Sequence, residues 1–474
     1  MMELAQALRW LPGAQLHGDP RQPIRRVFSD TRGLRDGDLF VALKGDRYDA
    51  NQFLAQASAA GAAAALTSDA AALAQAGLPG IVVADTRKAL GDLARGWRAQ
   101  FSLPLIAVTG SNGKTTVTQM LAAIVQRWHG DAALATQGNF NNDIGLPLTL
   151  LRLRASHRVA VVELGMNHPG EIARLATIAG PTVALVNNAQ REHLEFMATV
   201  EAVARENGAV ITALPADGIA VFPQDDAFAC IWRNLAGQRQ CQVFSTTFPA
   251  DPASAPEVAC NAASWRDGAW QVRADTPDGP LAFTLRMPGR HNLHNALAAA
   301  TSALAAGVPR RHIVAGLEAF EPVKGRSRTH VLNLSGKTCT LVDDSYNANP
   351  DSVDAALAML ADMPAPRLMV LGDMGEVGDQ GPVFHAQAGA RAHALGIESL
   401  FTLGALSVHA ARTFSGSRHF DTMNALIDAV RQQAGGMASI LVKGSRFMQM
   451  EKVVEALERH AQALSTATGD AACC

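Results

Sequence analysis

Leu105-Ile-Ala-Val-Thr-Gly-Ser-Asn-Gly-Lys-Thr-Thr116 is the segment of this sequence that decides the fold. Its first four residues are apolar and predict a buried strand, a glycine-containing turn follows, and residues 117–127 predict a helix. Gly110 and Gly113 have no Cβ, so the backbone N–H groups of the turn can surround an anion. The amides and the dipole at the start of the helix favour a phosphate at the same place. The segment therefore predicts a phosphate-binding loop.

Two side chains of this loop point to a nucleotide with its metal ion. Lys114 is suited to bridge terminal phosphates, and the Thr115 hydroxyl is suited to ligate Mg²⁺. The common form of the loop has its first glycine five residues before the second, where this chain has Val108. The loop is thus a shortened G-x-x-G-K-T form, and a chance Gly-Lys-Thr turn is the alternative.

Composition limits the function classes. A length of 474 residues predicts about three domains. The net charge of −2 argues against a nucleic-acid binder or an anionic-membrane binder. The six cysteines form no C-x-x-C pair, which favours a reducing compartment. No secretory signal and no apolar run of about 18 residues is present. We therefore expect a cytoplasmic protein without membrane insertion.

Alternating strand and helix patterns predict an α/β protein of three domains. In the middle of the chain, predicted strands at 105–108, 159–162 and 183–186 alternate with predicted helices at 117–127, 171–178 and 200–213, a pattern typical of a doubly wound parallel sheet. Turn signals within residues 257–287 add a small antiparallel patch. The predicted units are a small α/β domain (1–100), the central domain (101–320), a third, Rossmann-like α/β domain (321–464) and a flexible tail (465–474).

Polar residues collect where the central strands are predicted to end, which is where a doubly wound sheet binds ligands. Glu163 ends one strand and is a candidate metal ligand, with a surface acid as the alternative. His193 follows the next strand and is a second candidate, although a lone loop histidine is the more common case. Asn139, Asn141 and Asn142 lie in a glycine-punctuated loop whose amides are able to read sugar hydroxyls, unless the loop is an ordinary turn.

Two clusters in the second half of the chain also contain polar residues that are candidates for ligand binding. Asn292 lies at the start of a predicted helix, where its amide is able to read an adenine edge. Asp343 follows a strand and suits a ribose diol, and Tyr346 offers a stacking face. Helix capping by the Asn and Asp side chains is the alternative in both places.

In this order, the segments resemble the Mur ligase family, ATP-dependent amide-forming enzymes of peptidoglycan precursor synthesis. The resemblance covers nearly the whole chain, from Phe28-Ser-Asp-Thr-Arg32 to Leu441-Val-Lys-Gly-Ser-Arg446. Within the family, it is most similar to members that add D-alanyl-D-alanine to UDP-N-acetylmuramoyl-tripeptide. The strings that favour this are Gly138-Asn-Phe-Asn-Asn-Asp-Ile-Gly145, Glu163-Leu-Gly-Met-Asn-His-Pro-Gly-Glu171, Asp343-Asp-Ser-Tyr-Asn-Ala-Asn-Pro350 and Lys443-Gly-Ser-Arg446. The Asp-Asn-Pro-Arg string expected of the member that adds the third residue is absent.

The resemblance implies a role for each matching position. ATP would be bound by Gly110, Ser111, Asn112, Gly113, Lys114, Thr115 and Thr116, with Asn292 at adenine, Arg326 at the γ-phosphate and Asp343 at the ribose. Thr115 and Glu163 would bind one Mg²⁺ and His193 a second, so the catalytic set is Lys114, Glu163, His193 and Arg326. The UDP-sugar would be held by Ser29, Thr31, Arg32, Lys44 and Gly45, and the muramoyl peptide by Asn139, Asn141 and Asn142. The dipeptide would face Lys443, Ser445 and Arg446.

One position departs from the family pattern. Many members carry a carbamylated lysine that supports the second Mg²⁺, and Asn207 stands where that lysine is expected. We expect Glu206, or Asn207 with a water molecule, to take over this role, so that the enzyme needs no carbamate.

Other functions remain open from the sequence alone. One is a different ATP-dependent amide ligase of the same build, such as a folylpolyglutamate ligase or the third-residue muramoyl ligase. Another is a nucleotide-gated switch without ligase chemistry. We expect a monomer, and the sequence carries no signature for the third residue of the tripeptide, lysine or diaminopimelate.

Overall fold

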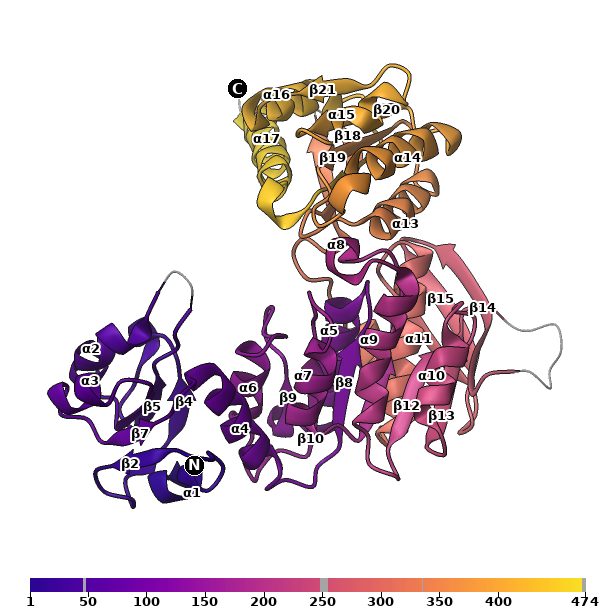
Figure 1. Cartoon of the computed structure of the whole chain (residues 1–474). Helices are drawn as coiled ribbons and strands as arrows, with labels where there is room; N and C mark the ends of the chain where they lie inside the picture. The colour runs from indigo at the N-terminus through magenta and orange to yellow at the C-terminus, as the bar shows by residue number, and fades with distance from the viewer. Residues whose placement is uncertain (46–47, 248–254, 335, 471–474) are drawn as a thin grey trace.

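Three α/β units follow one another along the chain in the computed structural model (Figure 1), which confirms the predicted fold class. The structure describes residues 1–45, 48–247, 255–334 and 336–470. We call the three the N-terminal, central and C-terminal units, and each has one main sheet. Among the described residues, no helix combines the length and the apolar character needed to cross a bilayer.

The N-terminal unit has a five-stranded sheet of order β2-β7-β6-β5-β4 and a separate β1-β3 pair. The strands β4 to β7 are parallel, and β2 is antiparallel to β7. The strands are β1 (Met2–Glu3), β2 (Gln15–His17), β3 (Pro23–Ile24), β4 (Arg26–Phe28), β5 (Asp38–Val41), β6 (Ala64–Thr67) and β7 (Gly80–Val82). The helices are α1 (Leu4–Leu8), α2 (Leu54–Ala59), α3 (Ala70–Gln75) and α4 (Thr86–Arg98).

The central unit has a nine-stranded sheet of order β16-β15-β14-β13-β12-β11-β8-β10-β9. The strands β8 to β13 are parallel, and β14 to β16 form the antiparallel patch that the turn signals predicted. The strands are β8 (Leu105–Thr109), β9 (Ala133–Ala135), β10 (Val159–Glu163), β11 (Val183–Val186), β12 (Ile219–Pro223), β13 (Gln240–Ser245), β14 (Val258–Arg266), β15 (Ala269–Asp275) and β16 (Leu281–Leu285).

Helices cover both faces of this sheet, because each buried strand presents apolar side chains to both. In β8, Leu105 and Ala107 join the core on one face, and Ile106 and Val108 join the core on the other. The first face packs against helices that include α7 and α9, and the second packs against α5, α11 and α12. The helices are α5 (Lys114–His129), α6 (Gly145–Leu150), α7 (Glu171–Ala179), α8 (Leu194–Met197), α9 (Val200–Thr212), α10 (Ala229–Ala236), α11 (Arg290–Ala305) and α12 (Arg310–Glu318).

The C-terminal unit has a six-stranded sheet of order β17-β18-β22-β19-β20-β21, parallel except for β17. Its last helix continues to Asp470, so residues 465–470 are helical where the sequence predicted a flexible tail, and residues 471–474 lie outside the described residues. The strands are β17 (Arg328–Leu334), β18 (Lys337–Asp344), β19 (Arg367–Gly372), β20 (Ser399–Leu403), β21 (Arg418–Phe420) and β22 (Ser439–Lys443). The helices are α13 (Pro350–Ala361), α14 (Gly381–Ala394), α15 (Val408–Arg412), α16 (Met423–Ala434) and α17 (Glu451–Asp470).

Helix α4 joins the N-terminal unit to the central unit by packing against α6 and α7. At its end, Trp97 Nε1 donates a hydrogen bond to the Leu153 carbonyl at 3.1 Å. The buried Arg98 guanidinium donates to the carbonyls of Ala179 and Gly180, both at 3.1 Å, at the C-terminal end of α7. These bonds fix the direction of α4, so its first turn is held at the edge of the cleft described next.

Candidate active site

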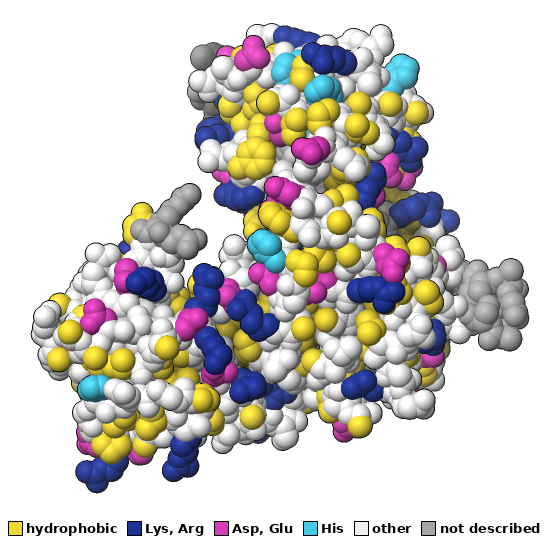
Figure 2. Space-filling model, viewed as in Figure 1, with side chains coloured by type: hydrophobic (Ala, Val, Ile, Leu, Met, Phe, Trp, Pro, Cys, Tyr) yellow, Lys and Arg dark blue, Asp and Glu magenta, His cyan; other side chains and the backbone are white. Residues whose placement is uncertain are grey.

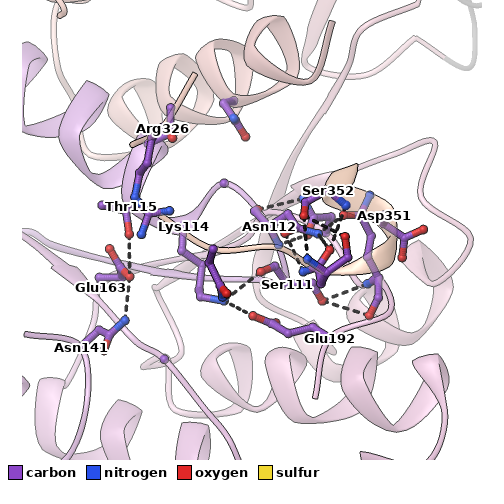
Figure 3. A pocket seen from close by; sticks show the side chains of 18 of the residues that line it. Ser111, Asn112, Lys114, Thr115, Asn141, Glu163, Glu192, Arg326, Asp351 and Ser352 are labelled. Atoms are coloured by element: carbon purple, nitrogen blue, oxygen red, sulfur yellow. Dashed lines mark hydrogen bonds and ion pairs between the residues drawn. The ribbon is translucent and has the colours of Figure 1, made fainter. Parts of the chain in front are cut away.

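A cleft of about 980 Å³ lies where the carboxyl ends of the central parallel strands meet the C-terminal unit. Figure 3 shows side chains of both units converging on it. It brings together many of the residues that the sequence predicted for the site. These are Ser111, Asn112, Gly113, Lys114, Thr115, Thr116, Asn139, Asn141, Asn142, Glu163, His193, Asn292, Arg326 and Lys443.

The phosphate-binding loop has the conformation that its glycines allow. Gly110 and Gly113 have φ angles of +132° and +82°, in the left-handed region that other residues disfavour. Helix α5 begins directly after Gly113, at Lys114. A Cβ on Gly113 would overlap the side chains of Asn295 and Asn187, so there is no room for a larger residue. The loop is therefore held from behind by packed asparagines.

Lys114 is folded back onto its own loop. Its Nζ donates hydrogen bonds to the carbonyl oxygens of Gly110 at 2.6 Å and Ser111 at 3.0 Å, and it pairs with Glu192 Oε1 at 2.8 Å. Both partners of this ion pair are largely buried. An incoming phosphate oxygen is the natural replacement for the Glu192 carboxylate, because it offers the ammonium group a negative charge at the same loop.

Thr115 and Glu163, the two residues predicted to bind one Mg²⁺, are in contact. Glu163 ends β10 and is only 1% exposed. Its Oε1 accepts hydrogen bonds from Thr115 Oγ1 at 3.1 Å and Asn141 Nδ2 at 2.8 Å (Figure 3). Its Oε2 is buried and has no hydrogen-bond partner among the described residues. A carboxylate and a hydroxyl oxygen beside a phosphate-binding loop form a donor set that suits Mg²⁺.

His193 is engaged in a different way from the one predicted. Its Nδ1 lies 2.7 Å from Glu376 Oε2 of the C-terminal unit, and its Nε2 lies 3.5 Å from Glu192 Oε1. Burial lowers the pKa of His193, but the two carboxylates outweigh it and raise the pKa to about 9. The described residues contain no group of three or more His, Cys, Asp or Glu side chains that could hold a metal ion. In this structure both ring nitrogens of His193 face carboxylates, and a role for His193 in binding a metal remains a prediction.

The C-terminal unit contributes a stacked arginine and a buried ion pair. The Arg326 guanidinium lies over the Tyr346 ring at 4.2 Å from the ring centroid. Lys443 Nζ lies 2.6 Å from Asp344 Oδ2. Burial raises the pKa of Asp344, but Lys443 and the other partners lower it overall.

Asp343 does not line the cleft, contrary to the predicted contact with a ribose. Its side chain is fully buried and accepts hydrogen bonds from the backbone N–H groups of Gly325 at 2.8 Å and Ser345 at 3.2 Å. Asp344 lines the cleft instead. Neighbouring residues of a strand point to opposite faces, and an Asp-Asp pair gives no indication of which one faces the ligand.

Several predicted substrate residues also lie away from the cleft. Ser445 Oγ donates to the Ala348 carbonyl at 3.0 Å and accepts from the Gly375 N–H at 2.7 Å. Arg446 pairs with Glu451 at 2.6 Å. The lining of the cleft also does not include the predicted residues of the N-terminal unit, which are Ser29, Thr31, Arg32, Lys44 and Gly45. A role for them in binding the UDP-sugar remains a prediction.

The proposed substitutes for the family lysine have other roles. Asn207 is fully buried, and its Oδ1 accepts hydrogen bonds from Thr109 Oγ1 at 2.6 Å and the Gly110 N–H at 3.0 Å. Glu206 accepts from the N–H groups of Gly170 and Ile172, both at 2.8 Å, at the start of α7. In this structure Asn207 anchors the phosphate-binding loop and Glu206 caps a helix, and neither lines the cleft, so support of a second metal by either residue remains a prediction.

Sequence reasoning missed the residues that hold Asn112. Its N–H donates to Asn188 Oδ1 at 2.9 Å, and its side-chain amide donates to Gln190 Oε1 at 2.6 Å. Asn349 Nδ2 of the C-terminal unit donates to Asn112 Oδ1 at 2.9 Å. The run of amide residues directly after β11 was a signal for the first two contacts, whereas the third joins residues 237 positions apart.

Comparison with known proteins gives matches along most of the chain. Residues 23–98 match the model of the Mur ligase family catalytic domain, residues 108–303 the Mur ligase middle domain, and residues 327–446 the glutamate ligase domain of Mur ligases.

Two relatives carry the name UDP-N-acetylmuramoyl-tripeptide–D-alanyl-D-alanine ligase. The protein of Escherichia coli (strain K12) is 41% identical over 440 residues, which are 92% of this chain and 94% of that protein. The protein of Bacillus subtilis (strain 168) is 31% identical over 442 residues, covering 92% and 93%.

Solved structures show the same architecture. A crystal structure of MurF from Acinetobacter baumannii has a TM-score of 0.88 at 33% identity and covers 96% of this chain and 98% of its own. MurF from Thermotoga maritima, solved in complex with ADP, has a TM-score of 0.80 at 24% identity, covers 93% and 98%, and supports the fold alone.

The ion pairs of His193 lead to a pH prediction. We expect NMR of the ligand-free protein to show the His193 ring titrating near pH 9, above the ordinary value of 6.5. The variant E376Q removes one carboxylate and should lower this pKa. Because the pKa of His193 is higher in the folded state, its ion pairs stabilise the folded protein. This contribution to the free energy of unfolding is complete below about pH 6.5 and is lost as the pH rises through about 9. A midpoint at or below 6.5 in the unaltered protein would contradict this pairing.

Proposed function

The chain belongs to the Mur ligase family, and we propose that it joins D-alanyl-D-alanine to UDP-N-acetylmuramoyl-tripeptide with ATP, giving UDP-N-acetylmuramoyl-pentapeptide, ADP and phosphate. The main support is one arrangement. The phosphate lysine Lys114 and the buried Thr115–Glu163 pair share a cleft with Arg326 of the C-terminal unit. The relatives that share this build over most of their length carry the name of this ligase.

The chemistry explains why a ligase needs such a site. A carboxylate is a poor electrophile, because an amine cannot expel oxide from it. Transfer of the γ-phosphoryl group of ATP to the tripeptide's terminal carboxylate gives an acyl phosphate, whose leaving group is inorganic phosphate. Both reactants of this transfer are anions, so the site must cancel their repulsion and hold them in line.

The residues of the cleft suit this task. The backbone N–H groups from Gly113 to Thr116, at the start of α5, are suited to bind the phosphates, whereas those of Gly110 and Asn112 are bonded to asparagines. Lys114 exchanges Glu192 for a phosphate oxygen, and Arg326 brings a second positive charge from the other side of the cleft. Such fixed charges act through positioning and electrostatics. Mg²⁺, which would be held by Thr115 and Glu163, would neutralise phosphate charge when bound.

The second step uses the amine of the dipeptide, which attacks the activated carbonyl and releases phosphate. It needs no covalent enzyme nucleophile. We place the tripeptide along Asn139, Asn141 and Asn142, and the adenine at Asn292. Lys443, fixed by Asp344, lies on the C-terminal side of the cleft and faces the incoming dipeptide. We further propose that the enzyme acts as a monomer in the cytoplasm.

A substrate-pair assay tests this function. ADP release should require both UDP-N-acetylmuramoyl-tripeptide and D-alanyl-D-alanine, and it should be absent with a folate acceptor or with a single amino acid. The variant K114A should abolish turnover and leave binding of the UDP-linked substrate nearly unchanged, because Lys114 acts on the phosphates of ATP. Normal turnover of K114A, or ADP release without the dipeptide, would reject the proposal.

The position of Asn207 gives a second prediction. An asparagine has no amine to react with CO₂, and this side chain is buried under the phosphate-binding loop. Adding bicarbonate to a CO₂-depleted assay should therefore leave kcat unchanged. A clear rise in kcat would show that a carbamate on another side chain is needed and would contradict the prediction.

A further inference from the structure

Two arginines converge on one carboxylate at the edge of the cleft. Arg174 Nη2 of α7 lies 2.9 Å from Asp143 Oδ2, and Arg87 Nε, in the first turn of α4, lies 3.5 Å from the same oxygen. All three residues line the cleft. Figure 2 shows Lys and Arg side chains gathered on the central unit where it faces the N-terminal unit.

This group, the Arg87–Arg174 pair with Asp143, carries two positive charges against one negative charge, and most of its N–H donors are not used in hydrogen bonds between the described residues. The two arginine side chains are 50% and 51% exposed, whereas Asp143 is 14% exposed. Within the described part of the chain, the bond from Arg174 to Asp143 is the only side-chain hydrogen bond of either guanidinium. The neighbouring acid Glu171 is already occupied, because its Oε2 accepts from the N–H groups of Asn167 and His168.

Such a pair suits a planar oxyanion. Guanidinium groups bind carboxylate and phosphate oxygens through forked hydrogen bonds, and the two anions share this chemistry. The place of the two arginines in the cleft indicates which of the two anions, carboxylate or phosphate, they would bind. The loop that carries Asp143 also carries Asn141, which bonds to Glu163 beside the phosphate-binding loop. The N-terminal residues predicted to hold the UDP-sugar do not line this cleft. This position favours a carboxylate from the peptide end of the substrate over the diphosphate as the anion that the arginines would bind.

We propose that Arg87 and Arg174 bind a carboxylate of the tripeptide other than the one that is activated. The inference rests on the proposed function and names a subsite within it. In the empty site Asp143 holds the two guanidinium groups toward each other. In the filled site the substrate carboxylate takes the remaining donors. Because α4 is fixed to the central unit at Trp97 and Arg98, the subsite keeps a set position relative to Glu163.

Kinetics of single variants test the subsite. In R87A and R174A the KM for UDP-N-acetylmuramoyl-tripeptide should rise roughly tenfold or more, as expected for losing charge-assisted hydrogen bonds. The KM values for ATP and for D-alanyl-D-alanine should change less than about twofold. R205A is the matched control, because Arg205 is exposed, pairs with Glu201 at 2.7 Å and does not line the cleft. An unchanged KM for the tripeptide substrate in both R87A and R174A would overturn the proposal.

Two binding probes distinguish the carboxylate from the diphosphate. UDP should bind equally well to the unaltered enzyme and to the double variant R87A/R174A. A tripeptide substrate with its non-reacting carboxylates converted to primary amides should bind more weakly to the unaltered enzyme, and the double variant should no longer discriminate against it. A matching loss of UDP affinity, or full discrimination by the double variant, would overturn the assignment. Absence of turnover in the unaltered enzyme would instead reject the proposed function.

Discussion

The site depends on one constraint, the tight glycine turn between β8 and α5. The turn positions Thr115 against the buried Glu163 and directs the start of α5 toward the cleft. Buried asparagines that pack against the turn fix its shape. Asn207 accepts the Gly110 N–H, Asn187 donates to the Asn112 carbonyl at 2.8 Å, and Asn295 fills the space beside Gly113. Buried amides bond to a backbone without adding charge beneath a site that must bind anions.

The second feature is the way in which the C-terminal unit meets this loop. Two residues of the loop that follows β11 form charged pairs with the C-terminal unit. Arg191 pairs with Asp351 at 2.7 Å, and His193 pairs with Glu376 at 2.7 Å. Glu192, between them, pairs with Lys114. Three consecutive residues thus connect Lys114 to the C-terminal unit, and Glu192 lies next to both Lys114 and His193.

Local patterns in the sequence were sufficient for the loop and for Glu163. A buried strand, two glycines and a helix are adjacent in the chain. An acid at the end of a predicted parallel strand lies at the edge of the sheet where such sheets bind ligands. The start of α5 was predicted three residues late, because Gly113 gives no side-chain capping signal. The strand β13 was missed because its first three residues, Gln240, Cys241 and Gln242, include two polar side chains and are not buried, although the strand lies between β14 and β12.

Contacts between distant residues were beyond the sequence. One of the two carboxylates at His193, that of Glu376, lies 183 positions away in another unit, so this contact could not be predicted from the sequence. The choice between Asp343 and Asp344 depends on which face of β18 meets the cleft. Asn207 was correctly noted as unusual, but its bonds to Thr109 and Gly110 come from the packing of α9 beneath the loop.

Isotope transfer tests the chemistry that this site is built to perform. The tripeptide substrate should be labelled with ¹⁸O in the carboxylate that becomes the new amide, and the phosphate released during turnover should be examined by mass spectrometry. One labelled oxygen should appear in the phosphate, because the carboxylate oxygen bonds to phosphorus before the amine displaces it. Phosphate free of label in a reaction that yields the pentapeptide would contradict an acyl phosphate and the roles assigned to Lys114 and Arg326.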